Sequence, residues 1–322
     1  DTTNVTATVG EYSRTNALLI NRLDTNSMTL ASDSMIVKSY DGGNNWANVT
    51  PAFGPGIRIR FIYELVYHPT DTNIIYTGCM IIDAPNQSMY SAILRSSNGG
   101  LTWSIGALIP QAINQLPARA AIAVTKSNPN LVKVVVADMA GGLQGIYSSN
   151  NAGVSFVKIA GHNNYTTNIL SREVDGSGQG GQGYYDLCIA IDPLDIKHII
   201  VGGVNSWESR DSGYTWTLMT QWAEDKSGVP LVHADHHFTG YHPLHDSLLF
   251  DCNDGGIYVF RPKPFVGGNP VWMDLTVDMD ITQYYRNAVS GNASFVLGGA
   301  QDNGTTMIDR NTSIGSPVGP GD

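Results

Sequence analysis

An eight-residue pattern occurs four times along this chain of 322 residues. Each copy reads Ser-x-Asp/Asn-x-Gly-x-x-aromatic, and the copies begin at Ser39, Ser96, Ser149 and Ser209. The starting serines are 57, 53 and 60 residues apart. A spacing this regular indicates one supersecondary unit repeated along the chain. The repeat therefore limits the fold before any single residue is given a role.

The residues of this pattern are expected to form a tight turn between two antiparallel strands. The oxygen at the third position can accept hydrogen bonds from N–H groups of its own loop, and glycine at the fifth permits a positive φ. The closing aromatic can pack inward over the turn. Because Asn98 and Asn151 keep the acceptor oxygen without the charge, we interpret the pattern as structural, not catalytic. Its residues are Ser39, Asp41, Gly43, Trp46, Ser96, Asn98, Gly100, Trp103, Ser149, Asn151, Gly153, Phe156, Ser209, Asp211, Gly213 and Trp216.

A second pattern lies between the copies of the first: an apolar strand, a turn that usually contains proline, and another apolar strand. It occurs at 65–76, 122–132, 189–200 and 240–250. Proline fixes φ and ends the first strand, and the Asp or Asn that follows closes the turn. Together the two patterns predict a repeated unit of four antiparallel strands.

The Ser-to-aromatic motifs resemble Asp-box repeats, also called BNR repeats, of β-propellers such as sialidases, xyloglucanases and sortilin-like domains. The resemblance implies an all-β chain, a β-propeller of four-stranded antiparallel blades with Asp-box hairpins. The fifth unit lacks the motif and the sixth stops without a closing outer strand. We therefore expect five blades plus part of a sixth, in a single domain over 1–322 that belongs to a longer polypeptide with further domains. The expected blades are at about 1–50, 57–110, 118–160, 184–222, 233–276 and 281–322, with an inter-blade loop at 161–183.

Charge and composition exclude several classes of partner. The formal net charge of −10 argues against nucleic acid or an anionic membrane surface, because both bind basic patches. No apolar run is long enough to span a membrane, and residues 1–20 lack the features of a signal peptide, so we interpret the sequence as a mature or excised piece. Cys79, Cys188 and Cys252 lie in apolar strand-like runs. Buried free thiols are the simpler interpretation, and one disulfide with a leftover thiol is the alternative.

The densest polar cluster is the run from His233 to His237. On a strand, His233, Asp235 and His237 would share one face, and His236 would point the other way. Two imidazoles and a carboxylate could bind a structural divalent metal or orient a substrate. The alternative is that these side chains bond one another along the inner strands of the ring. No motif requires a cofactor.

Two glycine-rich turns supply further candidates. Asp254 lies in the turn at 253–256, and Gln301 and Asp302 lie in the turn at 298–304. These three side chains could face the same end of the ring. Turn formation by Asp and Asn next to Gly is the simpler explanation.

A long polar segment at 161–183 ends in a run of glycines. It is either a flexible insertion or a functional loop over one face. Tyr184, Tyr185 and Asp186 follow it directly, and they could line a sugar-binding surface or pack in the core.

The resemblance extends over nearly the whole chain. The runs at 183–207, 233–237, 253–256, 281–285 and 298–304 are similar to large secreted bacterial proteins of the BNR-repeat or sortilin-like glycosyl hydrolase type. The resemblance implies an extracellular or cell-surface location in a bacterium.

From this resemblance we expect a binding, adhesion or scaffold module for an extracellular glycan or protein ligand, without catalysis in this fragment. The alternative is a glycoside hydrolase of the xyloglucanase-like type, with acid and base carboxylates drawn from Asp235, Asp254 and Asp302. A peptide binder resembling sortilin rests on fold analogy alone.

Overall fold

The computed structural model describes residues 8–9, 14–109, 117–161, 167–223, 226–261, 271–276, 279, 283–300, 304–311 and 315–319. The chain is all-β, and neighbouring strands within each sheet run antiparallel. Within the described ranges, no helix is long and apolar enough to cross a membrane. Gln301 and Asp302 lie outside the described residues.

The N-terminal half of the chain forms three sheets. The first contains β1 (Thr15–Asn21), β2 (Asp24–Ser32), β3 (Ile36–Ser39) and β4 (Ala47–Asn48). The second contains β5 (Ile57–Ile62), β6 (Val66–Tyr67), β7 (Ile75–Asp83), β8 (Ser88–Ser96) and β9 (Ser104–Ile109), with β5 and β6 both paired to β7. The third contains β10 (Pro117–Val124), β11 (Val132–Asp138), β12 (Leu143–Ser149) and β13 (Val157–Gly161).

The C-terminal half forms three further sheets, each with its strands in sequence order. The fourth contains β14 (Cys188–Ile191), β15 (Ile199–Gly202), β16 (Ser206–Ser209) and β17 (Thr217–Thr220). The fifth contains β18 (His236–His242), β19 (His245–Asn253), β20 (Gly256–Arg261) and β21 (Val271–Asp274). The sixth contains β22 (Tyr284–Val289), β23 (Phe295–Ala300), β24 (Thr305–Asp309) and β25 (Gly315–Gly319).

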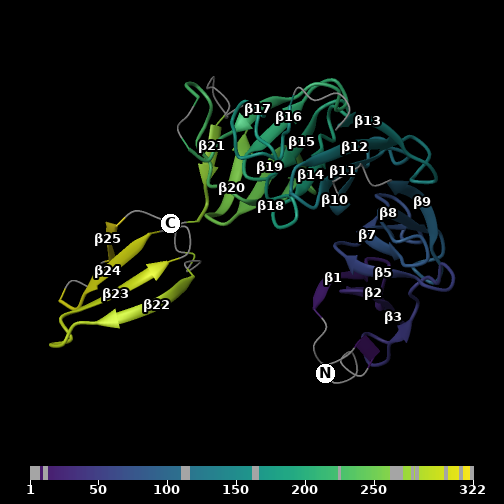
Figure 1. Ribbon diagram of the computed structural model, residues 1–322, viewed down its shortest axis with the longest axis horizontal. Coiled ribbons are helices and arrows are strands. Elements are labelled where there is room, and N and C mark those ends of the chain that lie inside the picture. Colours follow the sequence, from purple (N-terminus) through teal and green to yellow (C-terminus); the bar gives the residue numbers. More distant parts are fainter. Residues whose placement is uncertain are drawn as a thin grey trace.

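Figure 1 shows the first five sheets side by side in an arc, with the sixth sheet standing apart from them. Neighbouring sheets contact one another through their strands: β10 contacts β7 of the second sheet and β14, the first strand of the fourth, and β14 contacts β18, the first strand of the fifth. Hydrophobic clusters fill the spaces between sheets. Tyr76 and Ile93 of the second sheet, for example, pack with Val134 of the third. Each sheet therefore buries its faces against its neighbours in the arc.

The sixth sheet corrects one expectation. β25 pairs with β24, so this sheet has the fourth strand that the sequence was expected to lack. The segment 315–319 contains two glycines and Pro317. Pro317 is tolerated because it lies on the last strand of the sheet, where its missing N–H breaks no ladder on the open side.

The four repeated corners share one hydrogen-bond pattern. The serine Oγ accepts a hydrogen bond from the glycine N–H at 2.8–3.0 Å and donates to the Asp or Asn Oδ1 at 2.8–3.0 Å. That Oδ1 also accepts the N–H of the seventh residue at 2.8–3.0 Å. Asn98 and Asn151 add a bond from the amide to a hydroxyl, on Thr102 and Ser155, at 2.9 Å. The acceptor oxygen is thus the shared requirement, and the charge is not.

The fourth position of the corner also has a positive φ, which the sequence pattern did not indicate. Ala152 and Ser212 have φ of 54° and 71°, and glycine fills this position in the first two corners. The carbonyl of Ala152 accepts hydrogen bonds from Arg95 at 2.8 Å and from Tyr76 at 3.0 Å, and that of Ser212 accepts one from Lys133 at 2.9 Å. These donors belong to the preceding sheet, so each of these two corners bonds its neighbour.

Strand direction divides the arc into two faces. The corners and the proline turns lie at one end of the sheets, which we call the corner face. Residues 167–187, 226–235 and 253–256 lie at the other end, which we call the loop face. All three cysteines are free: Cys79 and Cys188 are buried, and Cys252 is half-buried.

Candidate functional site

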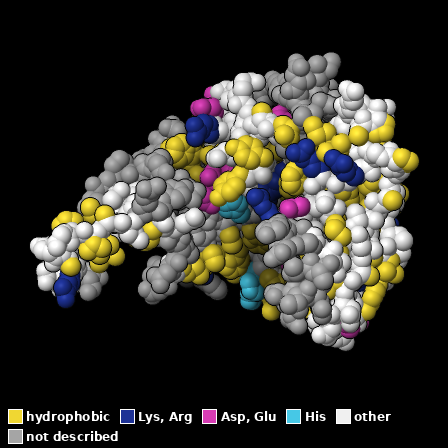
Figure 2. Space-filling model, turned by 60° about the horizontal axis from the view of Figure 1, so that its bottom comes forward, with side chains coloured by type: hydrophobic (Ala, Val, Ile, Leu, Met, Phe, Trp, Pro, Cys, Tyr) yellow, Lys and Arg dark blue, Asp and Glu magenta, His cyan; other side chains and the backbone are white. Residues whose placement is uncertain are grey.

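A hollow of about 860 Å³ lies between the inner strands of the second to fifth sheets. Its walls come from β6, β10, β14 and β18 and are largely apolar, whereas Glu64, Arg119 and His237 line it near the loop face. Figure 2 shows basic, acidic and histidine side chains gathered beside hydrophobic ones on this side of the molecule. The polar end of the hollow is therefore the candidate site.

Asn168 fastens the loop that borders this end of the hollow. Its Oδ1 accepts hydrogen bonds from the N–H groups of Leu143 and Leu170 at 2.9 and 3.2 Å. Its Nδ2 donates to the carbonyls of Gly178 and Gly180 at 3.0 and 2.7 Å. One amide side chain thus joins the middle of the glycine-rich run to the third sheet.

Glycine is required where this loop meets 139–142. A Cβ on Gly181 would overlap the carbonyl oxygen of Leu170. The N–H of Gly181 donates to the carbonyl of Ala140, and that of Gly183 to the carbonyl of Gly141, both at 3.0 Å. The glycines therefore serve close backbone approach, not phosphate binding. Residues 167–183 form a packed loop over one face.

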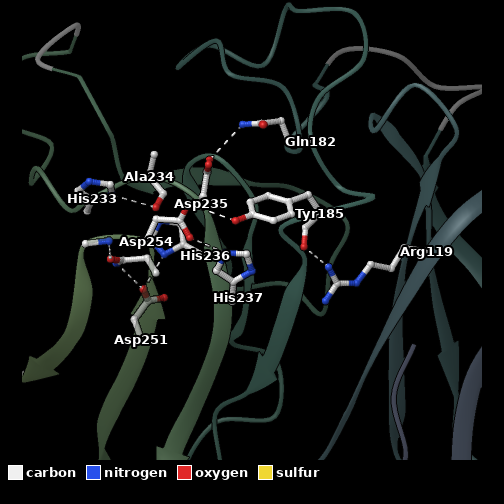
Figure 3. A network of polar contacts seen from close by, with 12 residues as sticks. Arg119, Gln182, Tyr185, His233, Ala234, Asp235, His236, His237, Asp251 and Asp254 are labelled. Atoms are coloured by element: carbon white, nitrogen blue, oxygen red, sulfur yellow. Dashed lines mark hydrogen bonds and ion pairs between the residues drawn. The ribbon is translucent and has the colours of Figure 1, made fainter. Parts of the chain in front are cut away.

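The loop delivers Tyr185 and Asp186 to the edge of the hollow. The carbonyl of Gln182 accepts hydrogen bonds from the N–H groups of Tyr185 and Asp186 at 2.6 and 3.0 Å, which closes a tight turn just before β14. Arg119, on β10, donates to the carbonyls of Tyr185 and Leu187. Its guanidinium therefore fixes this turn from the neighbouring sheet (Figure 3).

The run from His233 to His237 is not a continuous strand. β18 begins at His236, and Asp235 has a φ of 66°, so the side chains do not alternate as predicted. The expectation that His233, Asp235 and His237 share one face is wrong for this reason. Gln182 donates to Asp235 at 3.1 Å, and the Nδ1 of His233 lies 3.2 Å from the carbonyl of Ala234.

Two histidines in this run each pair with a carboxylate. The Nδ1 of His236 lies 2.6 Å from Asp251, and both side chains are only 1% exposed. The Nε2 of His237 lies 2.7 Å from Asp254, whose other oxygen accepts the Tyr185 hydroxyl at 3.4 Å. The rings of Tyr185 and His237 meet edge to face at 4.8 Å. This mutual bonding agrees with the alternative that these side chains bond one another without a ligand. The His237–Asp254 pair, unlike the buried His236–Asp251 pair, is partly exposed and borders the hollow.

Two acids at this end are held in the protonated form. Burial, together with the neighbouring Asp235 carboxylate, raises the pKa of Asp186 to about 8. Asp186 is fully buried, and neither of its carboxyl oxygens has a hydrogen-bond partner among the described residues. Burial also raises the pKa of Glu64 to about 8, against the opposing effect of the Arg119 charge. Protonation removes most of the cost of burying these groups.

The proposed metal ligands are not gathered into one set. In the part of the chain that the structure describes, no three His, Cys, Asp or Glu side chains are grouped so that they could hold a metal ion. Asp235 and His237 instead bond different partners, Gln182 and Asp254. The expected divalent metal at His233, Asp235 and His237 therefore gains no support from this geometry.

We call Arg119, Gln182, Tyr185, Asp186, Asp235, His237 and Asp254 the mouth cluster. Figure 3 labels all of these residues except Asp186. Sequence reasoning had named five of these residues as candidates: Tyr185, Asp186, Asp235, His237 and Asp254. It missed Gln182, Arg119 and the nearby Glu64. The available signal was a charged residue inside an otherwise apolar run, at Glu64 and at Arg119, which is unusual for buried strands. Tyr184 is 56% exposed beside the cluster.

Comparison with solved structures shows which known folds this chain is similar to. No family model and no curated protein matches the chain. An ancestral GH74 enzyme superposes with a TM-score of 0.53 at 15% identity, over 95% of this chain and 38% of that one. YCF48 from Cyanidioschyzon merolae gives 0.46 at 14% identity, over 95% and 85%. The GH74 xyloglucanase from Xanthomonas campestris gives 0.45 at 13% identity, over 95% and 50%.

This chain spans well under half the length of the ancestral GH74 enzyme. At 15% identity the likeness bears on the fold and not on the activity. Antiparallel four-stranded sheets side by side in an arc agree with it. The chain therefore has a β-propeller fold of the kind seen in glycosyl hydrolases.

Proposed function

We propose that this chain is a secreted or cell-surface β-propeller module of a bacterium that binds an extracellular glycan or protein ligand, for adhesion or scaffolding. The six sheets are six blades, and the corners are Asp-box hairpins of the BNR type. The observation that carries the proposal is the hollow of about 860 Å³ that ends at the mouth cluster. Concave, largely apolar sites with a few convergent polar groups are the usual form of ligand sites.

The aromatic residues at the mouth favour a glycan within this proposal. Tyr184 and Tyr185 are 56% and 44% exposed, and Gln182, Asp235 and Asp254 offer polar atoms next to Tyr185. Sugars present one apolar face and many hydroxyls, which suits an aromatic ring bordered by carboxylates and amides. Arg119 is engaged with backbone carbonyls, so a neutral glycan fits better than an acidic one.

A glycan array of plant and microbial polysaccharide fragments tests this function. Tyr185→Ala should weaken binding of the array hit by about 30-fold, the effect of a contact worth ~2 kcal/mol. Tyr214→Ala is the matched control, because Tyr214 is 64% exposed on the corner face. An array without any ligand, or equal losses for the two variants, would count against the proposed site.

One observation favours glycoside hydrolysis as the second candidate. Asp186 keeps a proton beside Asp235, and this reaction needs one carboxylic acid and one carboxylate. Asp235 and Asp254 were the candidate carboxylates, and both lie in the mouth cluster. Release of reducing ends from xyloglucan that disappears in Asp235→Asn, with the fold intact, would replace the binding-module proposal.

A further inference from the structure

We infer that the sixth sheet docks on the uncovered face of the fifth sheet, as the next sheet of the arc, and that it closes the hollow beside β18 when it does so. Figure 1 shows the sixth sheet apart from the arc, and we call this arrangement the open form. The docked form is its closed counterpart and is the form favoured in solution. This inference concerns an interaction surface within the chain and does not depend on the proposed ligand.

The fifth sheet has one covered face and one uncovered face. Tyr241 and Leu249 pack with the fourth sheet. Because side chains alternate along a strand, their neighbours Gly240 and Phe250 point the other way. Phe238 shares this second face, since a Cβ on Gly240 would lie 2.7 Å from its ring. We call the second face the free face, and it carries Phe238, Gly240, Phe250, Cys252 and Met273.

The sixth sheet is built in the same register as the fifth. Asn253 pairs with the first residue of β18, and Ala300 pairs with the first residue of β22. A register shift follows directly in both of these strands. Leu249 lies four residues before Asn253, and Val296 lies four residues before Ala300. Val296 therefore occupies the position at which Leu249 packs against the preceding sheet.

The face of the sixth sheet that carries Val296 is apolar and uncovered. Val296 pairs with Val289 on one side and with Ile308 on the other. These three side chains are 37%, 63% and 42% exposed, whereas Leu249 at the matching position is 1% exposed. A sheet buries its apolar face against another element in a stable domain. The sixth sheet thus lacks the contact that the fifth sheet makes with the fourth.

The free face of the fifth sheet is the complementary surface. Phe238 is 54% exposed and Met273 is 38% exposed. In the arc, each sheet from the second to the fifth packs on the sheet before it through apolar side chains of this kind. Docking of the sixth sheet continues that series. Phe238 also lines the hollow, so a sheet that covers Phe238 closes the hollow on that side.

The connection between the two sheets is long enough for docking. Nine residues, 275–283, lie between the end of β21 and the start of β22. Eight residues, 49–56, join the first and second sheets, and seven, 110–116, join the second and third. Those sheets are packed on one another in the arc. The sixth sheet can therefore reach the fifth without unfolding of either sheet.

Cys252 is a native probe of docking. It lies opposite Phe238 on the free face and is half-buried, whereas Cys79 and Cys188 are buried. The test is the rate at which iodoacetamide labels Cys252, followed by peptide mass spectrometry. Val296→Arg should raise this rate at least about tenfold over the wild type, because a charge in the apolar interface favours the open form by ~1.4 kcal/mol or more.

A matched control and a second variant accompany this test. Val154→Arg is the control, because Val154 is a valine that is 59% exposed on the corner face. It should leave the labelling rate of Cys252 unchanged. Ile308→Arg repeats the test from another strand of the sixth sheet. Labelling of Cys79 and Cys188 reports unfolding, so a variant that fails to fold is recognised and the other variant decides.

Small-angle X-ray scattering of the wild type tests docking without any substitution. We expect one compact particle with a radius of gyration of about 20 Å, as for a folded chain of this length. A separate lobe in the wild type, equal labelling in the wild type and both arginine variants, or an equal increase in Val154→Arg would overturn docking. So would protection of Cys252 that grows with protein concentration, because a second copy would then cover the free face. Neither measurement needs a ligand, so an array without hits would leave docking standing, and failure of docking would leave the binding function standing.

Discussion

Two equally buried polar side chains, one on the corner face and one on the loop face, differ in their hydrogen bonding. Ser96 on the corner face is 0% exposed, and its hydroxyl bonds the Asn98 side chain and the Gly100 N–H at 3.0 and 2.9 Å. Asp186 on the loop face is also 0% exposed, yet its carboxyl has no partner among the described residues. Complete pairing serves stability. Unpaired burial costs stability and is typical of functional sites.

The origin of the partners explains this difference. A corner takes most of its partners from eight consecutive residues, so each copy is largely self-sufficient. The mouth cluster draws Arg119 from the third sheet, Gln182 and Asp186 from the loop before the fourth, and Asp254 from the fifth. Its geometry therefore depends on how the sheets are assembled. Substitutions on the two faces should therefore distinguish the locally bonded corners from the mouth cluster, which depends on several sheets.

The largest effect is expected from Gly181→Ala on the loop face. The added Cβ would overlap the Leu170 carbonyl, and backbone cannot yield as a side chain can. We expect a loss of about 3 kcal/mol in the free energy of unfolding, in the range of overpacked sites. Urea denaturation measures it. Gly291→Ala is the control, since a Cβ there meets nothing within 4 Å. Similar losses for both would show that the loop is not tightly packed.

Ser96→Ala should have the next largest effect, now on the corner face. It leaves the buried Gly100 N–H without its acceptor, which costs about 1–3 kcal/mol. The same denaturation experiment measures this loss. The comparison of faces would be undermined if Ser96→Ala were neutral, because the corner would then not depend on its internal hydrogen bonds.

His198→Gln should cost about 1 kcal/mol at pH 6. His198 lies on the corner face between Asp192 and Glu208, at 3.0 and 2.9 Å. Burial opposes its charge, but the two carboxylates outweigh burial and raise the pKa of His198 above 6.5. Its contribution is therefore complete below pH 6.5 and is lost as the pH rises through the raised pKa. Unfolding measured from pH 5 to 9 should show this decline in the wild type, and a weaker decline in the variant.

Asp211→Asn should have the smallest effect. Burial opposes ionisation, but hydrogen bonds from Thr215, Ser209 and Tyr214 lower the pKa of Asp211 to about 2. Its contribution is present above pH 4 and is lost as the pH falls toward 2. At pH 7 we expect a change below about 0.5 kcal/mol, as for exposed surface sites, because Asn98 fills the same position in another corner. A larger loss, measured by thermal unfolding, would mean that the charge itself matters.

Local features were readable from the sequence and long-range ones were not. The corners and the proline turns each depend on residues close together in the sequence. The repeated four-stranded unit could therefore be predicted from Ser, Asp, Gly and Trp at fixed spacings and from the proline turns between them. The conformation of His233 to His237 was not predictable, because nothing in the local sequence indicates the positive φ of Asp235 or the start of β18 at His236. The pairing of Pro317 was not predicted, because a segment with proline and glycine has weak strand propensity although it can form an edge strand.

The proton state of Asp186 was likewise beyond the sequence. Tyr184, Tyr185 and Asp186 could be singled out from the sequence as a candidate surface. The raised pKa of Asp186, however, results from burial between sheets and from Asp235, which is distant in the sequence. Arg119 and Glu64 could have been noticed as charges in apolar runs. Glu64 and Arg119 line the same hollow because the sheets are arranged in an arc, and no local sequence pattern indicates that arrangement.

The carbonyls of Ala152 and Ser212, which accept hydrogen bonds from the preceding sheet, have a consequence for truncating or extending the chain. The acceptors that Arg95 and Lys133 contact among the described residues lie in the unit that follows their own. In an excised single unit, the Arg95 or Lys133 side chain would lose its carbonyl acceptor and would be left to hydrogen-bond with water. In a tandem duplication of the unit, the second copy would supply that acceptor. A C-terminal truncation should therefore fall beyond the corner at 209–216, so that Arg95 and Lys133 both keep their acceptors.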